Sequence, residues 1–129
     1  MRRMLTVLLS MAIVVSAASE TRAQTFGPVI TVNGEGITGF ELDQRERFVT
    51  ALRLPGDPAR LAREGLIEDK LKLQAAREAG LEISPDELED GLSEFASRAN
   101  LTTEQFITEL AREGVAPQTF RDFVRSGIL

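Results

Sequence analysis

The fold class is decided by one stretch, Val29-Ile30-Thr31-Val32-Asn33-Gly34-Glu35-Gly36-Ile37-Thr38-Gly39-Phe40-Glu41. Its first four residues are β-branched, which favours a strand. Asn33-Gly34 then predicts a two-residue hairpin turn, because both residues tolerate a positive φ angle. Thr38 and Glu41 have the spacing of a capping box, which predicts the start of a helix. Two short strands are not stable alone, so we expect this hairpin to lie against helices.

Four more helices are predicted after the first one, which runs toward Arg53. Each begins at a capping residue or a first-turn proline, at Asp57-Pro58, Ser84-Pro85, Thr102 and Pro117. Residues suited to helix stops follow three of them, at Gly80, Asn100 and Gly114. The sequence therefore predicts a mainly α domain, in which a small N-terminal β-hairpin precedes about five helices that form a compact helical domain.

Apolar residues at helical spacing predict the core. In the first helix one face carries Phe40, Phe48, Ala51 and Leu52. In the third helix a narrow stripe carries Leu88, Leu92, Phe95 and Ala99. The second helix differs, because its apolar residues spread around most of its circumference, at Leu61, Leu66, Ile67, Leu71 and Leu73. It is either the central helix of a bundle, packed on two sides, or a helix whose apolar surface partly faces a ligand or partner.

Composition excludes most chemistries. The 129 residues include no Cys, His, Trp or Tyr, which removes thiol nucleophiles, imidazole bases and the usual metal ligands. The formal charge of −5 and the lack of a basic stripe make nucleic acid an unlikely partner. The acidic residues of the third helix, Glu87, Glu89, Asp90 and Glu94, are best interpreted as its solvated side. We expect no catalytic residue, no cofactor and no metal.

The first residues have the pattern of an export signal. Arg2 and Arg3 precede an apolar run from Met4 to Val15, and small residues follow up to Ala23. The run is shorter than the ~20 residues of a membrane-spanning helix. We expect residues 1–23 to be a signal peptide cleaved near Ala23, with a site after Ala18 as the alternative, and no stable membrane insertion afterwards. The remaining chain has 12 Lys and Arg against 19 Asp and Glu, a formal charge of −7.

With this signal, five pieces of sequence occur in a recognisable order: the signal, Ile30–Thr38, Leu66–Leu71 with Gln74-Ala75-Ala76, Gly80–Ser84, and Gly114 before Phe120-Arg121. In this order the pieces resemble the N-terminal domain of SurA-like periplasmic chaperones, a family with parvulin-type peptidyl-prolyl isomerase domains. The resemblance covers residues 24–129. It implies a SurA N-terminal-like helical chaperone domain, located in the periplasm, whose partners are unfolded segments of outer-membrane proteins.

Two functions from other classes stay open beside this chaperone hypothesis. The chain is either the N-terminal part of a parvulin-type isomerase whose catalytic domain is missing here, or a non-catalytic oligomerisation and assembly subunit. The parvulin centre has no counterpart in the sequence, so this chain is not expected to be an enzyme. The apolar end Ile128-Leu129 lacks a cap, and we expect a domain truncated at its C-terminus.

The predicted client-binding residues lie mainly on the last helix. One apolar side of this helix carries Phe120, Phe123, Val124 and Ile128. In SurA-like proteins later parts of the chain pack on this domain. This sequence does not include those parts, so we expect the apolar side to be uncovered. Leu66 and Leu73 on the second helix are the next candidates. An uncovered surface of this kind also favours self-association.

Overall fold

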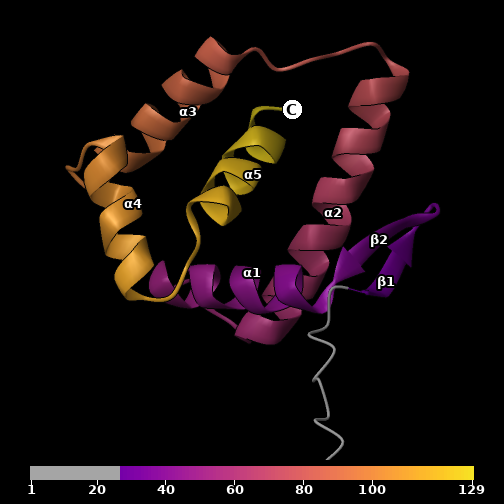
Figure 1. Ribbon diagram of the computed structural model, residues 1–129, viewed down its shortest axis with the longest axis horizontal. Helices are drawn as coiled ribbons and strands as arrows, with labels where there is room; N and C mark the ends of the chain where they lie inside the picture. The colour runs from indigo at the N-terminus through magenta and orange to yellow at the C-terminus, as the bar shows by residue number, and fades with distance from the viewer. Residues whose placement is uncertain (1–26) are drawn as a thin grey trace, which may run out of the picture.

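A computed structural model describes residues 27–129. The predicted signal peptide and its cleavage sites lie outside the described residues. The elements follow in the order β1 (Pro28–Val32), β2 (Glu35–Thr38), α1 (Gly39–Ala51), α2 (Pro58–Glu78), α3 (Pro85–Ser97), α4 (Thr103–Arg112) and α5 (Pro117–Ile128) (Figure 1). This confirms the prediction of a mainly α fold with a small hairpin and five helices.

The hairpin forms as the turn sequence predicts. Asn33 and Gly34 have φ angles of 49° and 85°, and β1 pairs with β2 in antiparallel register. One face of the hairpin carries Val32 and Ile37, which pack with Leu66 of α2 in a small apolar cluster. The hairpin is therefore stabilised by burial against α2, which two isolated strands would lack.

Helices α1 to α4 each begin at a side-chain cap. Capping boxes join Thr38 to Glu41 and Ser84 to Glu87 through reciprocal hydrogen bonds of 2.7 to 3.2 Å. Thr102 begins α4 in the same way. Asn100 ends the turn after α3 with a φ angle of 57°, as expected of a left-handed stop. The predicted starts and stops are confirmed.

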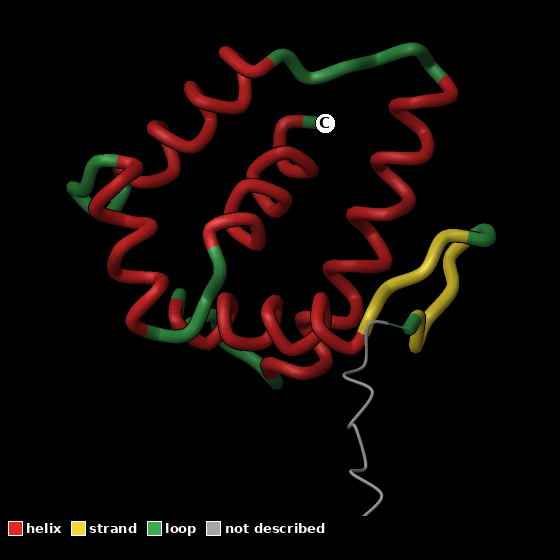
Figure 2. Tube along the Cα trace, in the orientation of Figure 1, coloured by secondary structure: helices red, strands yellow, loops and turns green. Residues whose placement is uncertain are grey.

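Helix α5 lies in the middle of the domain, between α2 on one side and α3 and α4 on the other, with α1 across one end (Figures 1 and 2). Helix α2 contacts α1, α5 and both strands, and its Leu71 is 46% exposed. The interpretation of α2 as the central helix of a bundle is therefore wrong, because α5 holds that place (Figure 1). Gly91 on α3 permits the close approach of α5, because a Cβ atom there would lie 3.0 Å from side-chain atoms of Val124 and Ile128.

The main core is a cluster of phenylalanines. Ring centroids lie 4.8 to 6.5 Å apart among Phe48, Phe95, Phe106, Phe120 and Phe123. Aliphatic residues of α3 and α4 pack around the rings. Phe40 does not belong to this cluster, which corrects the sequence prediction: it lies in the first turn of α1, where half of its surface stays exposed (50%). Within residues 27–129 no helix is long and apolar enough to cross a membrane.

Candidate functional site

The predicted uncovered side of α5 is largely core. Phe120 is 0% exposed and contacts the rings of Phe48 and Phe106, and Val124 is also buried. The expectation that these two side chains are free for a client is therefore wrong. The physical reason is the central position of α5, whose apolar side is covered by α1, α3 and α4 of the same chain. Phe123 is half-buried, and Ile128 is 41% exposed.

A groove of about 280 Å³ lies on the other side of α5, where α1, α2 and α5 meet. Leu66 and Leu73, the other two predicted residues, both line it. The remaining lining comes from α1 and α2 with Phe40, Glu41, Gln44, Arg45, Asp69 and Lys70, and from the α5 region with Ala116, Gln118, Thr119, Asp122 and Arg125. The structure thus brings together residues that are up to 85 positions apart, from Phe40 to Arg125.

The groove has apolar walls. Phe40 presents half of its surface, Leu73 and Ala116 are half-buried, and Leu66 closes the inner end as a buried residue. A partly exposed phenylalanine beside aliphatic side chains offers apolar area that a ligand can remove from water. These walls can bind apolar side chains.

The floor of the groove is polar and is held by Arg45. This side chain is 4% exposed, forms an ion pair with Asp69 of α2, and has its guanidinium carbon 5.0 Å from the centre of the Phe123 ring. The pair ties α1 to α2, while the ring contact ties both helices to α5. The Nε atom of Arg45 is the one buried side-chain nitrogen or oxygen in residues 27–129 that lacks a hydrogen-bond partner.

Gln44 fixes the beginning of α5 against α1. Its side-chain amide donates to the carbonyl of Gly114 at 3.1 Å and accepts from the backbone N–H of Ala116 at 2.7 Å and from the Thr119 hydroxyl at 3.1 Å. These bonds satisfy backbone groups at a helix start that has no side-chain cap. Gln44 therefore sets the position of the α5 wall of the groove.

The charges around the groove are balanced. The Nζ atom of Lys70 lies 3.6 Å from Oε1 of Glu41, and Nη1 of Arg125 lies 3.1 Å from Oδ1 of Asp122. Together with the pair of Arg45 and Asp69, three acids face three bases. The groove consequently has no net charge to select a strongly charged ligand, although the protein as a whole is acidic.

A second depression of about 300 Å³ lies between α3 and α5. It is lined by Gly91, Glu94, Phe95, Arg98, Phe123, Val124, Gly127 and Ile128. Three of the four predicted α5 residues thus meet here, although Ile128 alone among them is exposed. Phe120 lines neither this depression nor the groove between α1, α2 and α5.

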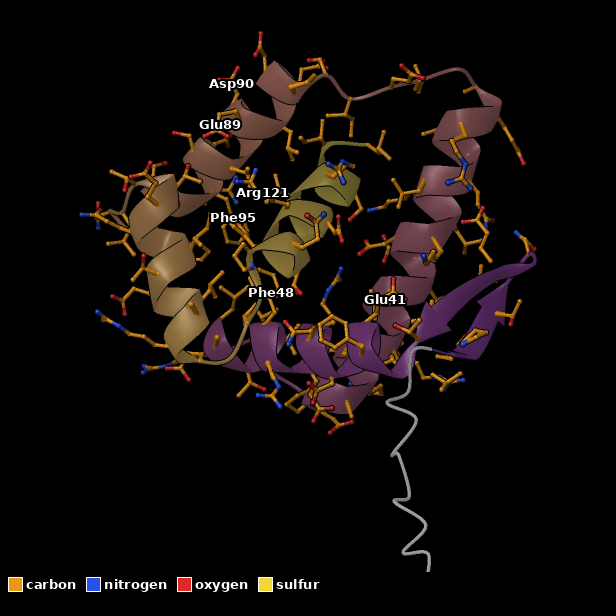
Figure 3. The ribbon with its side chains drawn as sticks, in the orientation of Figure 1. Glu41, Phe48, Glu89, Asp90, Phe95 and Arg121 are labelled. Atoms are coloured by element: carbon orange, nitrogen blue, oxygen red, sulfur yellow. The ribbon has the colours of Figure 1, made fainter. Side chains whose placement is uncertain are left out.

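The acidic residues of α3 are exposed to solvent, and Figure 3 shows Glu89 and Asp90 on the outer side of this helix. In the described part of the chain, no three acidic, His or Cys side chains group as a metal site would require. The pKa of Glu87 lies below its ordinary value because its carboxylate accepts hydrogen bonds from the backbone N–H and the hydroxyl of Ser84. That shift belongs to the helix cap, so it does not indicate acid or base chemistry.

Of the thirteen residues that line the groove, eleven are not among the predicted site residues, and Phe40, Gln44 and Arg45 matter most among them. The signal for the two polar ones was present, because Gln44 and Arg45 precede Phe48 by four and three positions and so fall on the buried face of α1. A glutamine and an arginine at core positions indicate a polar network. Apolar periodicity does not predict that Asp69 on α2 is the ion-pair partner of Arg45.

The chain is similar in sequence to known proteins over most of its length. The family model for the SurA N-terminal domain matches residues 54–129, and no parvulin isomerase domain is found in the chain. No solved structure matches the chain significantly.

Three relatives are each named Chaperone SurA. The one from Methylococcus capsulatus is 39% identical over 92 residues, which is 68% of this chain and 20% of that protein. The one from Pseudomonas syringae pv. tomato is 31% identical over 123 residues, covering 88% of this chain and 29% of the relative. The one from Nitrosospira multiformis is 31% identical over 134 residues, covering 97% and 30%. The match therefore spans less than a third of each relative's length.

Proposed function

Because this chain belongs to the SurA N-terminal domain family, we propose that it is a chaperone module of the periplasm that binds extended apolar and aromatic segments of unfolded outer-membrane proteins. The binding site in this proposal is the groove between α1, α2 and α5. The observation that carries it is the exposed Phe40 beside Leu73 and Leu66, in a groove whose charges are balanced.

The size and lining of the groove favour weak, tolerant binding. Burying one client Leu or Phe side chain contributes ~1.5 to 3 kcal/mol. A volume of about 280 Å³ holds one or two such side chains. Association costs consume much of that gain, so micromolar or weaker affinity is expected. Such affinity suits a chaperone, which must release its clients.

The α5 residues have a reduced part in this proposal. Ile128 and the accessible portion of Phe123 offer a second, smaller apolar contact in the depression beside α3. Phe120 and Val124 are excluded because they are buried. A client segment that leaves the groove therefore has one further apolar patch within the same domain.

The test compares groove leucines and phenylalanine with matched apolar residues outside the groove. The double variant Phe40→Ser with Leu73→Ser should weaken binding of a fluorescent peptide with alternating aromatic residues by about tenfold or more, which corresponds to ~1.4 kcal/mol. Both side chains are only partly buried, so helical content by circular dichroism should stay near that of the parent.

The control is the double variant Leu54→Ser with Leu81→Ser. These two leucines are exposed and lie outside the groove lining, so they remove a comparable apolar area elsewhere. Equal loss of binding in both double variants would refute the groove as the site. Retained binding in the groove variant would refute it as well.

We also propose that residues 1–23 are removed on export, leaving a chain that starts near Gln24. The support is the basic start, the short apolar run and Ala23. N-terminal sequencing of the product in a periplasmic extract should give a start at or near Gln24. Recovery of the uncleaved chain in the membrane fraction would contradict cleavage.

A further inference from the structure

Strand β1 is the outer strand of the hairpin. Figure 2 draws β2 next to the helices and β1 on the side away from them. The segment from Gly27 to Gly34 contains no charged residue, and Val29 within it is 54% exposed. Sheet edges in proteins are usually protected by lysine, by inward charges or by a covering element, because an open edge pairs readily with another strand.

The register shows which backbone groups this edge offers. Val32 and Glu35 flank the two-residue turn, so they form the hydrogen-bonded pair and Thr31 opposite Gly36 forms the next, non-hydrogen-bonded pair. The N–H and C=O of Thr31 therefore point away from β2. Within residues 27–129 no backbone or side-chain group is bonded to them, whereas the Val32 carbonyl accepts from the Gln74 side chain at 2.8 Å.

One protective device is present, and it is confined to the beginning of the strand. The register between β1 and β2 is broken by an irregularity at Val29, between the pairs of Pro28 and of Ile30. Such a bulge twists an edge and limits pairing there. The stretch from Ile30 to Val32 is regular and remains open to a partner strand.

We propose that the free edge of β1 binds an extended client segment by β-strand addition, with Thr31 as the central hydrogen-bonding residue. This inference rests on the proposed chaperone function and specifies how one part of a client is held. Backbone pairing reads strand-forming ability instead of particular side chains. Clients destined to become transmembrane β-strands have that ability in segments of ~10 residues with alternating apolar side chains.

The charge of the protein favours a client strand over a second copy at this edge. Two copies would each bring an excess of acidic residues, with a formal charge of −5 for the full sequence, whereas a neutral or basic client segment meets no such repulsion. The edge itself is uncharged and adds no repulsive group of its own. We therefore commit to an extended, neutral or basic peptide as the occupant.

Amide hydrogen exchange of Thr31 gives a direct test in the full chain. The probe is a ten-residue peptide of alternating valine or tyrosine and threonine with one terminal lysine. The Thr31 amide should exchange rapidly in the free protein and at least fivefold more slowly at saturating peptide, since one hydrogen bond of typical strength protects by about that factor. An unchanged Thr31 rate with bound peptide would overturn strand addition while leaving groove binding intact.

Backbone methylation of the peptide provides the matched control. Methyl groups on the amides of alternate residues block one edge of the peptide strand and leave the side chains unchanged. One of the two alternate series should lose affinity about fivefold or more and the other should keep it. Equal affinities for both series would overturn the proposal. Absence of binding by any peptide would instead reject the proposed function itself.

Two variants complete the test. Thr31→Pro removes the outward N–H and should lower peptide affinity, whereas Thr31→Val keeps it and should not. Should the proline variant lose the hairpin, the methylated peptides on the unaltered protein still decide the question. Slow Thr31 exchange without peptide, together with a dimer in sedimentation at the same concentration, would assign the edge to a second copy and overturn the client proposal.

Discussion

The two sides of α5 have opposite characters. One side inserts Phe120 and Val124 among the rings and aliphatic side chains of α1, α3 and α4, and is closed to water. The other side presents Gln118 and Asp122 to the groove shared with α1 and α2. The strong apolar stripe therefore marks the core, and the side with mixed polar and apolar neighbours is the one that remains open.

This difference explains why apolar periodicity misplaces a binding surface. A continuous stripe on a helix is the pattern that buries most completely within its own domain. A binding groove instead combines partly exposed apolar side chains with charges that keep it hydrated, as Phe40 and Leu73 share the groove lining with Lys70 and Asp122. The predictions below separate these two kinds of surface, beginning with the largest expected effect.

The closed side should fail first when it is opened. Phe120→Ser places a hydroxyl in the phenylalanine cluster and removes a fully buried ring, which costs about 4 kcal/mol or more. Since domains of this size are stable by only roughly 5 to 15 kcal/mol, a loss of this size should lower the Tm by ~15 °C or more. Thermal unfolding by circular dichroism measures this. A folded Phe120→Ser variant with impaired peptide binding would reverse the assignment of the two sides.

The floor of the groove should respond next. Arg45→Met leaves Asp69 without its cationic partner in a largely buried position, and a loss of about 3 kcal/mol in unfolding free energy is expected. Replacing both residues, as Arg45→Met with Asp69→Leu, should restore much of it because no charge is then orphaned. Urea unfolding of the three proteins gives the comparison. A double variant as unstable as the single one would show that the pair itself is not the source of the loss.

A smaller effect is expected at the cap that begins α3. The pKa of Glu87 is lowered in the folded state, so its capping bonds stabilise the protein above the unfolded pKa of the group, and this contribution disappears as pH falls through the folded pKa. Ser84→Ala removes the hydroxyl donor and should raise the pKa of Glu87 toward its ordinary value. An NMR titration of the Glu87 side chain measures its pKa in the parent protein and in Ser84→Ala. An unchanged pKa in Ser84→Ala would contradict the hydroxyl's contribution.

Much of the fold is predictable from local sequence because its boundaries are local. The turn at Asn33-Gly34 and the caps at Thr38, Ser84 and Thr102 each depend on two to four neighbouring residues, and all of them form as predicted. The free energies of this turn and these caps depend on neighbouring residues and not on tertiary packing. The positions of helix starts could therefore be derived without an alignment.

Only part of the candidate groove is predictable from the sequence. Leu66 and Leu73, which line it, are predicted because the second helix has apolar residues on too many sides to bury against one neighbour. The exposure of Phe40 and the pairing of Arg45 with Asp69 depend on how α1 crosses α2, which involves contacts 24 or more residues apart. Phe120 was misassigned because periodicity reports which side is apolar and does not report what covers it.

Photo-crosslinking from one residue in each depression tests the central claim most directly. A photoreactive amino acid replaces Gln118 at the exposed rim of the groove, or Glu94 at the exposed rim of the depression between α3 and α5. If clients bind in the groove between α1, α2 and α5, an added unfolded outer-membrane protein segment should crosslink strongly to position 118 and more weakly to position 94. Stronger crosslinking from position 94 would place the client on the α3 side and contradict the groove.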